Sequence, residues 1–423
     1  MTLSRRHFLA GLGIAGLGGL AVLRPADQGG GHNDYFLRLQ TLARQHAGGV
    51  PSVLLDLDLL DANLAALKQQ LNPRAAYRLV VKSLPAAGLI DYVMQHTGSQ
   101  RLMCFHLPFL QQCATRFPTA DLLLGKPLPI DAARRFVASA APGQLPRVQW
   151  LVDSPERLQQ YRQLAAQLGL PLRINIELDI GLHRGGVGDL HQLAAMLRII
   201  AAAPQQLAFS GFMGYDAHVG KIPSLLQNAA DSYRHSQEAY TAAIDLLRRQ
   251  APQLAQASLT LNGAGSPTLH WHRQQTVCND LAAGSCLLKP ADFDLPGLEA
   301  FQPAAFIATP VLKRLDATRI PGIEALAAPQ AWWDRNLQQS WFVYGGKWLA
   351  RYHSPPGLQD NPLYGSSSNQ SIVTGSRRVQ LAIDDWVFLR PTQSEAVLLQ
   401  FGDLLVHRGG EFLARWPVLR QQA

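Results

Sequence analysis

The sequence is poor in cysteine, which excludes a small protein stapled by disulfides. Only four of its 423 residues are cysteines, and they form neither a CxxC pair nor the Cys/His spacing of a zinc site. Cys104, Cys113, Cys278 and Cys286 are therefore expected to be buried thiols that pack as small hydrophobic side chains. Because 47% of the residues are hydrophobic, the chain can build a large core without such staples.

Charged residues are also scarce, at 16% of the chain. The 38 Lys and Arg residues outnumber 30 Asp and Glu residues, which gives a formal net charge of +8, but the cations are scattered along the sequence. No basic tract of the kind that binds nucleic acid is present, so nucleic acid is not an expected partner. A mild positive excess is suited to attracting a phosphate or a carboxylate.

The apolar run near the amino terminus is too short for an ordinary membrane-spanning helix. It covers residues 9–23 and includes five glycines, whereas a span needs about 20 apolar residues. The run follows Ser4-Arg5-Arg6-His7-Phe8-Leu9, and paired arginines before an apolar core indicate a twin-arginine export signal. We expect residues 1–31 to be signal and linker and the protein to be periplasmic. No A-x-A cleavage site follows, so removal of the segment and its retention as a membrane anchor both stay open.

In the middle of the chain, short apolar segments alternate with longer helical patterns, as in repeated βα units. Leu, Ala, Tyr and Ile recur at helical spacing over Ser154–Leu168 and Ser224–Gln250. Eight candidate strands with helices between them predict an α/β fold with a (β/α)8 TIM-type barrel. The strands are Arg78–Lys82, Arg101–Phe105, Asp121–Gly125, Arg147–Val152, Leu172–Leu178, Leu207–Phe212, Ser258–Asn262 and Asn279–Gly284.

A strand over Ser52–Asp58 and a helix from Leu60 precede the barrel, and the sequence changes character after about Pro303. Aromatic and β-branched runs with Gly turns then predict an all-β module. We therefore predict a barrel domain over residues 32–302 and a C-terminal β domain over residues 303–423. Its expected strands are Phe306–Leu312, Trp341–Tyr352, Trp386–Leu389, Val397–Gln400 and Leu404–Trp416, and its expected loops are Glu324–Asn336 and Pro355–Ser371.

Two cations follow candidate strands at the end where barrels of this type carry their active sites. Lys82 ends the first candidate strand, where partial desolvation would lower the pKa of its amine and allow a Schiff base. Arg184 lies among Gly181, Gly185 and Gly186, and a tight turn there would hold a fixed cation or donor against a ring nitrogen. Either residue alone would be an ordinary surface charge, and their shared rim is what indicates a site.

The loops after the last three candidate strands add hydroxyls, glycines and a histidine. Tyr215 and His218 follow the sixth strand, and His218 is the leading candidate for proton transfer. Gly263-Ala264-Gly265-Ser266-Pro267-Thr268 follows the seventh strand and Ala283-Gly284-Ser285 the eighth. Barrels often bind a phosphate in these two loops, where small residues let backbone N–H groups and hydroxyls surround it. The sequence therefore predicts a phosphate site there.

Six stretches between about Pro51 and Leu419 carry a family resemblance. They read PSVLLDLDLLDANL, VVKS, ELDIGLHRGGV, NGAGSPT, WFVYGGKWLA and RWPVL. Together they resemble the fold-type III pyridoxal-phosphate enzymes, specifically the D-threonine aldolase and D-serine dehydratase-like family with its alanine racemase N-terminal barrel. The combination is more specific for the cofactor and the fold than for the reaction.

The resemblance implies a pyridoxal 5'-phosphate-dependent lyase that cleaves a D-threonine-like β-hydroxy-D-amino acid to glycine and an aldehyde. Lys82 would hold the cofactor, Arg184 would face its pyridine nitrogen beside Tyr215, and Lys82, His218 and Tyr215 would be catalytic, with His218 taking the β-hydroxyl proton. The phosphate would bind Gly263, Gly265, Ser266, Thr268, Gly284 and Ser285. An amino-acid racemase and a non-catalytic protein that binds the cofactor or an amino acid are the alternatives, and related barrels favour a homodimer.

Two turns depart from the family pattern. Members that need a divalent metal carry a His and an acidic residue in a turn of the β domain, where this chain has Gln393 and Glu395. A neutral amide is a poor ligand beside imidazole, so no tight metal site is expected, although Glu395 could hold an ion weakly. The family's Glu-Glu-His turn is replaced by Ser368-Asn369-Gln370. Both changes affect the part of the family site that would read the substrate's β-hydroxyl group.

Overall fold

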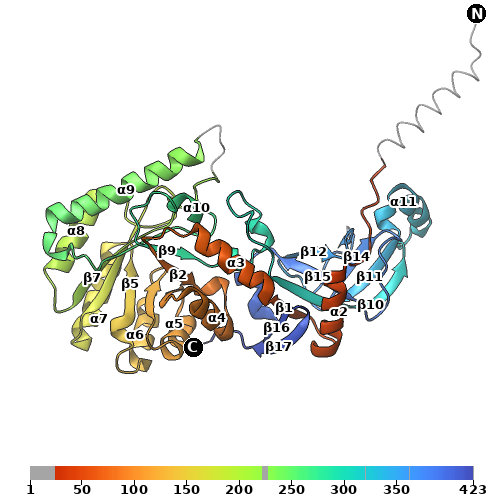
Figure 1. Cartoon of the computed structure of the whole chain (residues 1–423), viewed down its shortest axis with the longest axis horizontal. Helices are drawn as coiled ribbons and strands as arrows, with labels where there is room; N and C mark the ends of the chain where they lie inside the picture. Colours follow the sequence, from red (N-terminus) through yellow and green to blue (C-terminus); the bar gives the residue numbers. More distant parts are fainter. Residues whose placement is uncertain (1–23, 222–226, 320, 362, 423) are drawn as a thin grey trace, which may run out of the picture. The chain divides into compact units, whose positions relative to one another are not determined.

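The computed structural model describes residues 24–221, 227–319, 321–361 and 363–422, so the predicted twin-arginine motif and apolar run lie outside the described residues. The chain forms two compact units (Figure 1). The barrel unit comprises Leu55–Ala305, Thr392–Val406 and Ala414–Ala423, and the β unit comprises Met1–Leu54, Phe306–Pro391 and His407–Leu413. Within the described part of the chain, no helix combines the length and the apolar character needed to cross a membrane.

The barrel unit is built on eight parallel strands that close in chain order, which confirms the predicted TIM-type barrel. Each strand overlaps one candidate segment, and most differ from it only at the ends. The apolar runs are buried as expected for a parallel sheet covered by helices. The strands are β2 (Ala76–Val80), β3 (Arg101–Cys104), β4 (Asp121–Leu124), β5 (Val148–Val152), β6 (Leu172–Leu178), β7 (Leu207–Gly214), β8 (Thr260–Gly263) and β9 (Asp280–Ala283).

Helices follow most of these strands and carry the predicted amphipathic pattern. In α7 (Pro155–Leu168), the Ser154 hydroxyl caps the first turn by accepting from the Arg157 N–H, and Gly169 ends the helix at φ +65°. Helix α9 (Ala229–Gln250) covers most of the helix predicted over Ser224–Gln250 and begins after its N-cap Asn228, and residues 224–226 lie outside the described ranges. The others are α3 (Leu57–Gln70), α4 (Ala87–Thr97), α5 (Leu107–Arg116), α6 (Ile130–Ser139), α8 (Leu190–Ala201), α10 (Leu269–His272) and α12 (Ser394–Val397).

A second sheet has nine strands, mostly antiparallel, in the order β13-β14-β11-β10-β1-β16-β17, with β15 also paired to β10 and β12 to β15. It supports the predicted C-terminal all-β fold. The strands are β1 (Ser52–Asp56), β10 (Ala305–Asp316), β11 (Gln339–Tyr344), β12 (Ala350–Ser354), β13 (Gln359–Asp360), β14 (Gln370–Gly375), β15 (Trp386–Pro391), β16 (Leu404–Arg408) and β17 (Glu411–Trp416). Two helices accompany it, α2 (Asp34–His46) and α11 (Ala327–Trp333).

Several predictions for the C-terminal third were wrong. Val397–Gln400 is not a strand but the end of α12 and a following 3-10 turn, because so short an apolar run is compatible with either structure. The expected loop Glu324–Asn336 contains α11 and two 3-10 turns. Leu404–Trp416 is two strands, because Gly409 and Gly410 adopt φ +59° and +89° and form a turn between them.

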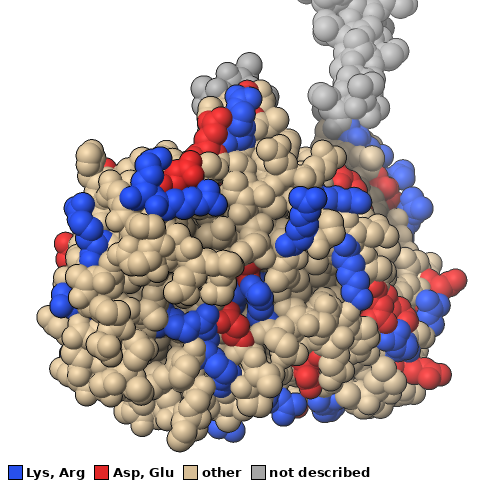
Figure 2. Space-filling view, turned by 60° about the vertical axis from the view of Figure 1, so that its left-hand side comes forward, with Lys and Arg blue, Asp and Glu red and all other residues tan. Residues whose placement is uncertain are grey.

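Trp341–Tyr352 is likewise divided between β11 and β12, with Gly345 at φ +152° in the intervening turn. The long predicted loop Pro355–Ser371 is irregular except for β13 and the beginning of β14. The four cysteines are free thiols and are buried, as expected for thiols that pack as small hydrophobic side chains. Figure 2 shows Lys, Arg, Asp and Glu dispersed over one face of the molecule among many uncharged side chains, in keeping with the scattered charge of the sequence.

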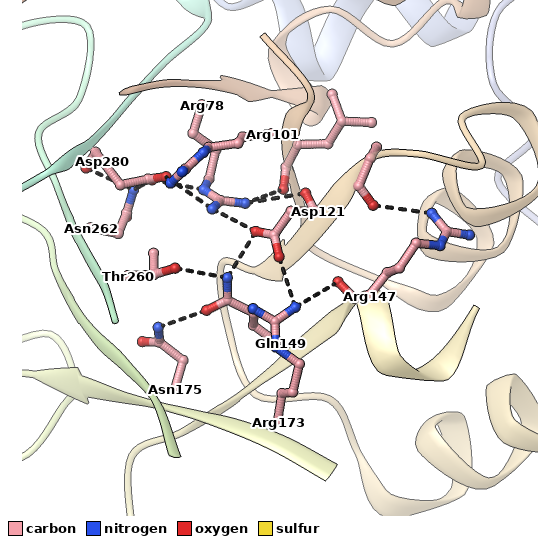
Figure 3. A network of polar contacts seen from close by, with 12 residues as sticks. Arg78, Arg101, Asp121, Arg147, Gln149, Arg173, Asn175, Thr260, Asn262 and Asp280 are labelled. Atoms are coloured by element: carbon pink, nitrogen blue, oxygen red, sulfur yellow. Dashed lines mark hydrogen bonds and ion pairs between the residues drawn. The ribbon is translucent and has the colours of Figure 1, made fainter. Parts of the chain in front are cut away.

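A network of charged and polar side chains joins the barrel strands near their amino-terminal ends (Figure 3). Arg78 of β2 is fully buried, and its Nε and Nη2 donate to the two carboxylate oxygens of Asp280 at 2.7 and 2.9 Å. Arg78 Nη2 also donates to Asp121 Oδ2 at 2.8 Å. Arg173 donates to the other oxygen of Asp121, and Arg101 to Asp280. Paired in this way, buried charges no longer carry their full desolvation penalty.

Candidate active site

A cavity of about 420 Å³ opens at the carboxyl ends of the barrel strands, where the sequence predicts the site. All of its lining residues belong to the barrel unit. Among the described residues, the predicted site residues Gly263, Thr268 and His218 are not part of the lining. The predicted residues that do line it are Lys82, Arg184, Tyr215, Gly265, Ser266, Gly284 and Ser285.

Lys82 lies in a 3-10 turn, Val81–Ser83, immediately after β2. Its side chain is exposed to the cavity, and its ammonium nitrogen lies 4.5 Å from the centre of the Phe105 ring. Desolvation lowers the pKa of Lys82 despite that exposure, because the cavity walls surround the amine. Glu395 opposes this shift, whereas Arg184 adds to it. The result is an amine that becomes neutral, and so nucleophilic, at lower pH than an ordinary lysine.

Arg184 and Tyr215 lie against each other in the cavity. The Arg184 guanidinium carbon is 5.0 Å from the centre of the Tyr215 ring, which is a cation–π contact. Burial, followed by the nearby Asp216 carboxylate, raises the pKa of Tyr215, so its hydroxyl keeps its proton at neutral pH. The pair presents a permanent cation and a phenol to one side of the cavity.

Three glycines shape the loop that carries Arg184. Gly181, Gly185 and Gly186 adopt φ +116°, +156° and +90°, which side-chain-bearing residues rarely adopt. A Cβ on Gly186 would lie 2.6 Å from the carbonyl carbon of Leu178, so the backbone approaches too closely for any side chain. The tight turn predicted from the sequence is therefore present, and it returns the chain onto the end of β6.

The loops after β8 and β9 are tied to each other through one hydroxyl. Ser266 Oγ accepts from the backbone N–H groups of Gly284 and Cys286 at 3.2 and 3.1 Å. A Cβ on Gly265 would lie 2.6 Å from the Tyr215 ring, and one on Gly284 would lie 2.8 Å from the Val80 carbonyl oxygen. Both positions therefore favour glycine, and they leave a small polar concavity that can accept an anion.

Thr268, predicted as a phosphate ligand, instead points away from the cavity. Its hydroxyl donates to Asp216 Oδ1 at 2.6 Å and accepts from the Gly265 N–H at 3.0 Å. Asp216 Oδ2 lies 2.7 Å from His272 Nε2, and both side chains are buried. Burial alone would lower the pKa of His272, but the carboxylate outweighs it and raises the pKa to about 10. The sequence analysis missed this pair, which holds the glycine loop from behind.

His218, the predicted proton acceptor, also lies behind the cavity wall. Its Nε2 is 3.3 Å from the Ser236 hydroxyl of α9, and a Cβ on Gly181 would approach that nitrogen to 2.9 Å. Burial lowers the pKa of His218, so the ring is neutral at physiological pH. The structure thus places His218 between the Arg184 loop and α9, outside the lining that holds Lys82.

The turn after β15 supplies two cavity residues that the sequence analysis considered only as doubtful metal ligands. Glu395 Oε1 accepts from the Ser83 hydroxyl at 2.8 Å and from the Ser285 hydroxyl at 3.3 Å. Gln393 Nε2 donates to Asp292 Oδ2 at 3.2 Å. Glu395, Gln393 and Asp292 all line the cavity. No sequence motif marked Glu395 as a proton-transfer candidate. Its position beside Lys82 depends on its contact with Ser83, and these two residues are more than 300 positions apart in the sequence.

The cavity fits pyridoxal phosphate by the chemistry of its donors. A lysine with a lowered pKa, a permanently charged arginine and two glycine–serine loops converge in it. The glycines leave room that a Cβ would fill, and the Ser266 hydroxyl, which accepts from two N–H groups, can still donate its own proton to a phosphate. Lys82 and Arg184 could hold the cofactor's aldehyde and ring nitrogen, and Gly265, Ser266 and Gly284 could surround its phosphate, whereas the Ser285 hydroxyl donates to Glu395.

A divalent metal does not fit the same donors. Gln393 offers a neutral amide that is bonded to Asp292, and one Glu395 oxygen is already occupied by two hydroxyls. Among the described residues, no cluster of three His, Cys, Asp or Glu side chains is arranged to hold a metal ion.

Comparison with known proteins agrees with this architecture. The D-threonine aldolase of an Arthrobacter species is 24% identical over 317 residues, which are 71% of this chain and 75% of that protein. The 3-hydroxy-D-aspartate aldolase of Paracoccus denitrificans is 21% identical over 250 residues, 57% of this chain and 61% of that protein. The crystal structure of D-threonine aldolase from Filomicrobium marinum has a TM-score of 0.67 at 17% identity, covering 88% of this chain and 96% of the other, so the fold is shared.

The model of the alanine racemase N-terminal domain matches residues 55–290. This range contains all eight strands of the barrel and the loops that place Lys82, Arg184 and Tyr215 in the cavity. Since the match spans more than half of the chain, this protein belongs to the alanine racemase N-terminal domain family.

Proposed function

We propose that this protein is a pyridoxal-phosphate-dependent lyase that cleaves a β-hydroxy-D-amino acid of the D-threonine type to glycine and an aldehyde. The observation that carries the proposal is a lysine of lowered pKa that shares a cavity with an arginine and two glycine–serine loops. The names of two similar proteins, a D-threonine aldolase and a 3-hydroxy-D-aspartate aldolase, support the substrate class.

The residues divide the work by their chemistry. Pyridoxal phosphate, when bound, supplies a carbonyl that joins amines and a ring that withdraws electrons from the substrate's Cα. Lys82 provides the amine that holds it and, once displaced, moves a proton at Nζ to and from Cα. Arg184, whose guanidinium carries only donors, would donate a hydrogen bond to the ring nitrogen of the bound cofactor. The loops after β8 and β9 bind and orient the phosphate.

Absorbance and product analysis test the proposal together. With added pyridoxal phosphate, we expect a visible band that borohydride bleaches, and acetaldehyde release from D-threonine. Lys82→Ala should lose both the band and the reaction, whereas Lys68→Ala, which removes an exposed lysine of α3, should keep both. A colourless wild type, or a Lys82→Ala variant with an unchanged band, would contradict the assignment.

A racemase is the second candidate, because Tyr215 and Lys82 enter the same cavity from different loops and give it two groups that can hold a proton. Incubation with L-alanine or D-alanine distinguishes the two reactions. Loss of optical purity without aldehyde release from D-threonine would favour the racemase. A visible band with neither reaction would favour a non-catalytic binding protein.

We also propose, from the sequence alone, that the twin-arginine route exports this protein to the periplasm. Arg5-Arg6 and the apolar run over residues 9–23 support the proposal. Replacing both arginines by lysine should retain the protein in the cytoplasm, as cell fractionation would show. Washing membranes with carbonate would then tell a retained anchor from a released protein.

A homodimer is the assembly we propose, since related barrels close their sites with a neighbouring subunit. Sedimentation velocity of the full chain measures this directly. A species of about twice the 46.3 kDa chain mass is expected, and a monomer at micromolar concentration would contradict it.

A further inference from the structure

The cavity contains a carboxylate that the proposed function has not yet used. The carboxyl groups of Glu395 and Asp292 both line it, but they are arranged differently. The Asp292 carboxylate receives the Gln393 side-chain amide. Glu395 faces Lys82 closely enough for its charge to oppose the lowering of the Lys82 pKa, and it helps to raise the pKa of Tyr215.

Two hydroxyls orient Glu395 through one of its oxygens. Ser83 follows Lys82 in the turn after β2, and Ser285 lies after β9, and both donate to Oε1. The two hydroxyl oxygens are themselves 2.9 Å apart, so they form one compact cluster with the carboxylate. Within the described part of the chain, the hydrogen bond to Oε2 is a long one, 3.5 Å from the Ser394 hydroxyl. One oxygen is fixed, therefore, and the other keeps capacity to accept a proton.

The other titratable groups near the cavity are less suited to accepting a proton from a hydroxyl group. Tyr215 is protonated at neutral pH because its pKa is raised. His218 does not line the cavity and is engaged with Ser236. Lys82 is already assigned to the proton at Cα. Asp292 also lines the cavity, but its carboxylate accepts from the Gln393 amide at 3.2 Å, whereas Glu395 lies beside Lys82 and is the carboxylate that we favour as general base.

We propose that Glu395 is the general base that takes the β-hydroxyl proton of the substrate, and that Ser83 and Ser285 position its carboxylate. The inference rests on the proposed lyase function. The O–H proton moves to Glu395 Oε2, the O–H electron pair forms the aldehyde C=O bond, and the Cα–Cβ bond breaks. The Cα–Cβ pair stays on Cα until Cα receives a proton from Lys82 Nζ. Glu395 then returns its proton to Lys82 through solvent, so neither residue changes its protonation state over a turnover.

The decisive experiment compares two reactions of the pyridoxal-phosphate-loaded enzyme. Cleavage of D-threonine needs a base at the β-hydroxyl, whereas exchange of the glycine α-hydrogen with deuterated water needs only the proton transfer at Cα. Glu395→Gln should lower kcat for cleavage by about 100-fold or more, the usual contribution of a general base, and change glycine exchange by less than about threefold. Glu156→Gln, which removes an exposed carboxylate in the first turn of α7, should alter neither.

Binding supplies a readout that is independent of turnover. The change in visible absorbance on adding D-threonine or D-2-aminobutyrate, which lacks the β-hydroxyl, gives the two affinities. The wild type should prefer D-threonine, and Glu395→Ala should weaken that preference by about tenfold, the size expected for a lost hydrogen bond to a charged group. Ser83→Ala, which keeps the carboxylate but removes one donor, should have a smaller effect in the same direction.

The outcomes separate failure of the inference from failure of the function. If the wild type cleaves D-threonine and Glu395→Gln lowers cleavage and glycine exchange equally, or lowers neither, Glu395 is not the base although the lyase stands. If the wild type exchanges glycine hydrogen but cleaves no β-hydroxy amino acid, the lyase proposal fails and the inference with it. Glu395→Asp, which keeps the charge on a shorter side chain, should retain more cleavage than Glu395→Gln and guards against misfolding of one variant.

Discussion

The two ends of the barrel interior use charged residues in opposite ways. At the amino-terminal end, Arg78, Asp280 and Asp121 are joined by hydrogen bonds of 2.7 to 2.9 Å, and Arg78 and Asp280 are fully buried (Figure 3). At the carboxyl end, Lys82 and Arg184 face an open cavity and contact aromatic rings. One end satisfies its charges within the fold, and the other leaves donors and acceptors available to a ligand.

The difference follows from what each end must do. Burial would lower the pKa of Arg78, but the carboxylates of Asp280 and Asp121 outweigh it and raise that pKa, so the charge is permanent. Burial lowers the pKa of Lys82, and there the single carboxylate of Glu395 does not compensate. Charge that stabilises a fold is paired, whereas charge kept for chemistry is left partly unpaired at some cost in stability.

The largest expected effect comes from breaking the paired end. Arg78→Met should destabilise the barrel unit by about 3–5 kcal/mol, because it leaves two partly or fully buried carboxylates without their main partner. Urea denaturation followed by far-UV circular dichroism measures the change. Arg134→Met, which removes an exposed arginine paired to Asp131 on α6, is the control and should change stability by about 0.5 kcal/mol or less. Similar losses for the two variants would show that the buried network does not hold the barrel together.

The contrast between the two ends also explains what could be predicted from sequence. Local patterns gave the eight strands, because each is a short apolar run followed by turn or capping residues. They also located Lys82, Arg184 and the two glycine loops, since a barrel places all strand ends on one rim. Tyr215, Asp216 and His218 share a single loop, yet only Tyr215 lines the cavity. The backbone geometry and packing of the loop decide which of these three side chains points into the cavity. The spacing of residues in the sequence does not give this information.

Long-range contacts were equally beyond the reach of local patterns. Glu395 lies in α12, which follows β15, and accepts a hydrogen bond from Ser83 across 312 positions of sequence. Val397–Gln400, just after it, has the composition of a strand but forms a helical turn. The pairing of Asp216 with His272 could not be predicted from local patterns either, because neither residue belongs to a recognisable motif and 56 positions separate them.

The Asp216–His272 pair predicts a pH dependence of stability. The pKa of His272 is raised from 6.5 in the unfolded chain to about 10 in the fold. Its contribution is therefore complete below pH 6.5 and is lost as the pH rises through about 10. Denaturation of the protein without cofactor, from about pH 7 to about pH 9, should show this decline.

Asp216→Asn should flatten that decline, since the His272 ring loses the carboxylate that raises its pKa. Subtracting one pH profile from the other also cancels the contribution of Glu177 to stability. Burial raises the pKa of Glu177 to about 7, and its contribution falls over an overlapping pH range. His191→Gln, which removes an exposed histidine of α8, should leave the slope unchanged. Parallel profiles for wild type and Asp216→Asn would mean that His272 is neutral in the fold.

A smaller effect is expected from the loop that carries Arg184. Gly186→Ala should cost about 1–3 kcal/mol, because alanine at φ +90° is strained and its Cβ would meet the Leu178 carbonyl carbon at 2.6 Å. Movement of Arg184 should also weaken pyridoxal phosphate binding in an absorbance titration. Gly188→Ala is a matched control in the same loop. The new Cβ would lie 3.6 Å from the Asp179 Cβ, which is an ordinary van der Waals contact. If the two substitutions lower the free energy of unfolding equally, the backbone conformation at Gly186 does not position Arg184.

The smallest expected change in stability is also the sharpest test of the contrast. Lys82→Met replaces a cation by an apolar side chain only four residues after Arg78, so the two substitutions form a matched pair, one within β2 and one in the turn that follows it. Lys82 is exposed to the cavity, and its unfavourable desolvation disappears with the charge, so stability should change by about 0.5 kcal/mol or less. The comparison must be made without added pyridoxal phosphate, because binding would stabilise the wild type alone. If Lys82→Met destabilises the barrel unit as much as Arg78→Met does, Lys82 stabilises the fold just as the buried network does. The proposed contrast between paired structural charges and charges available to a ligand would then be wrong.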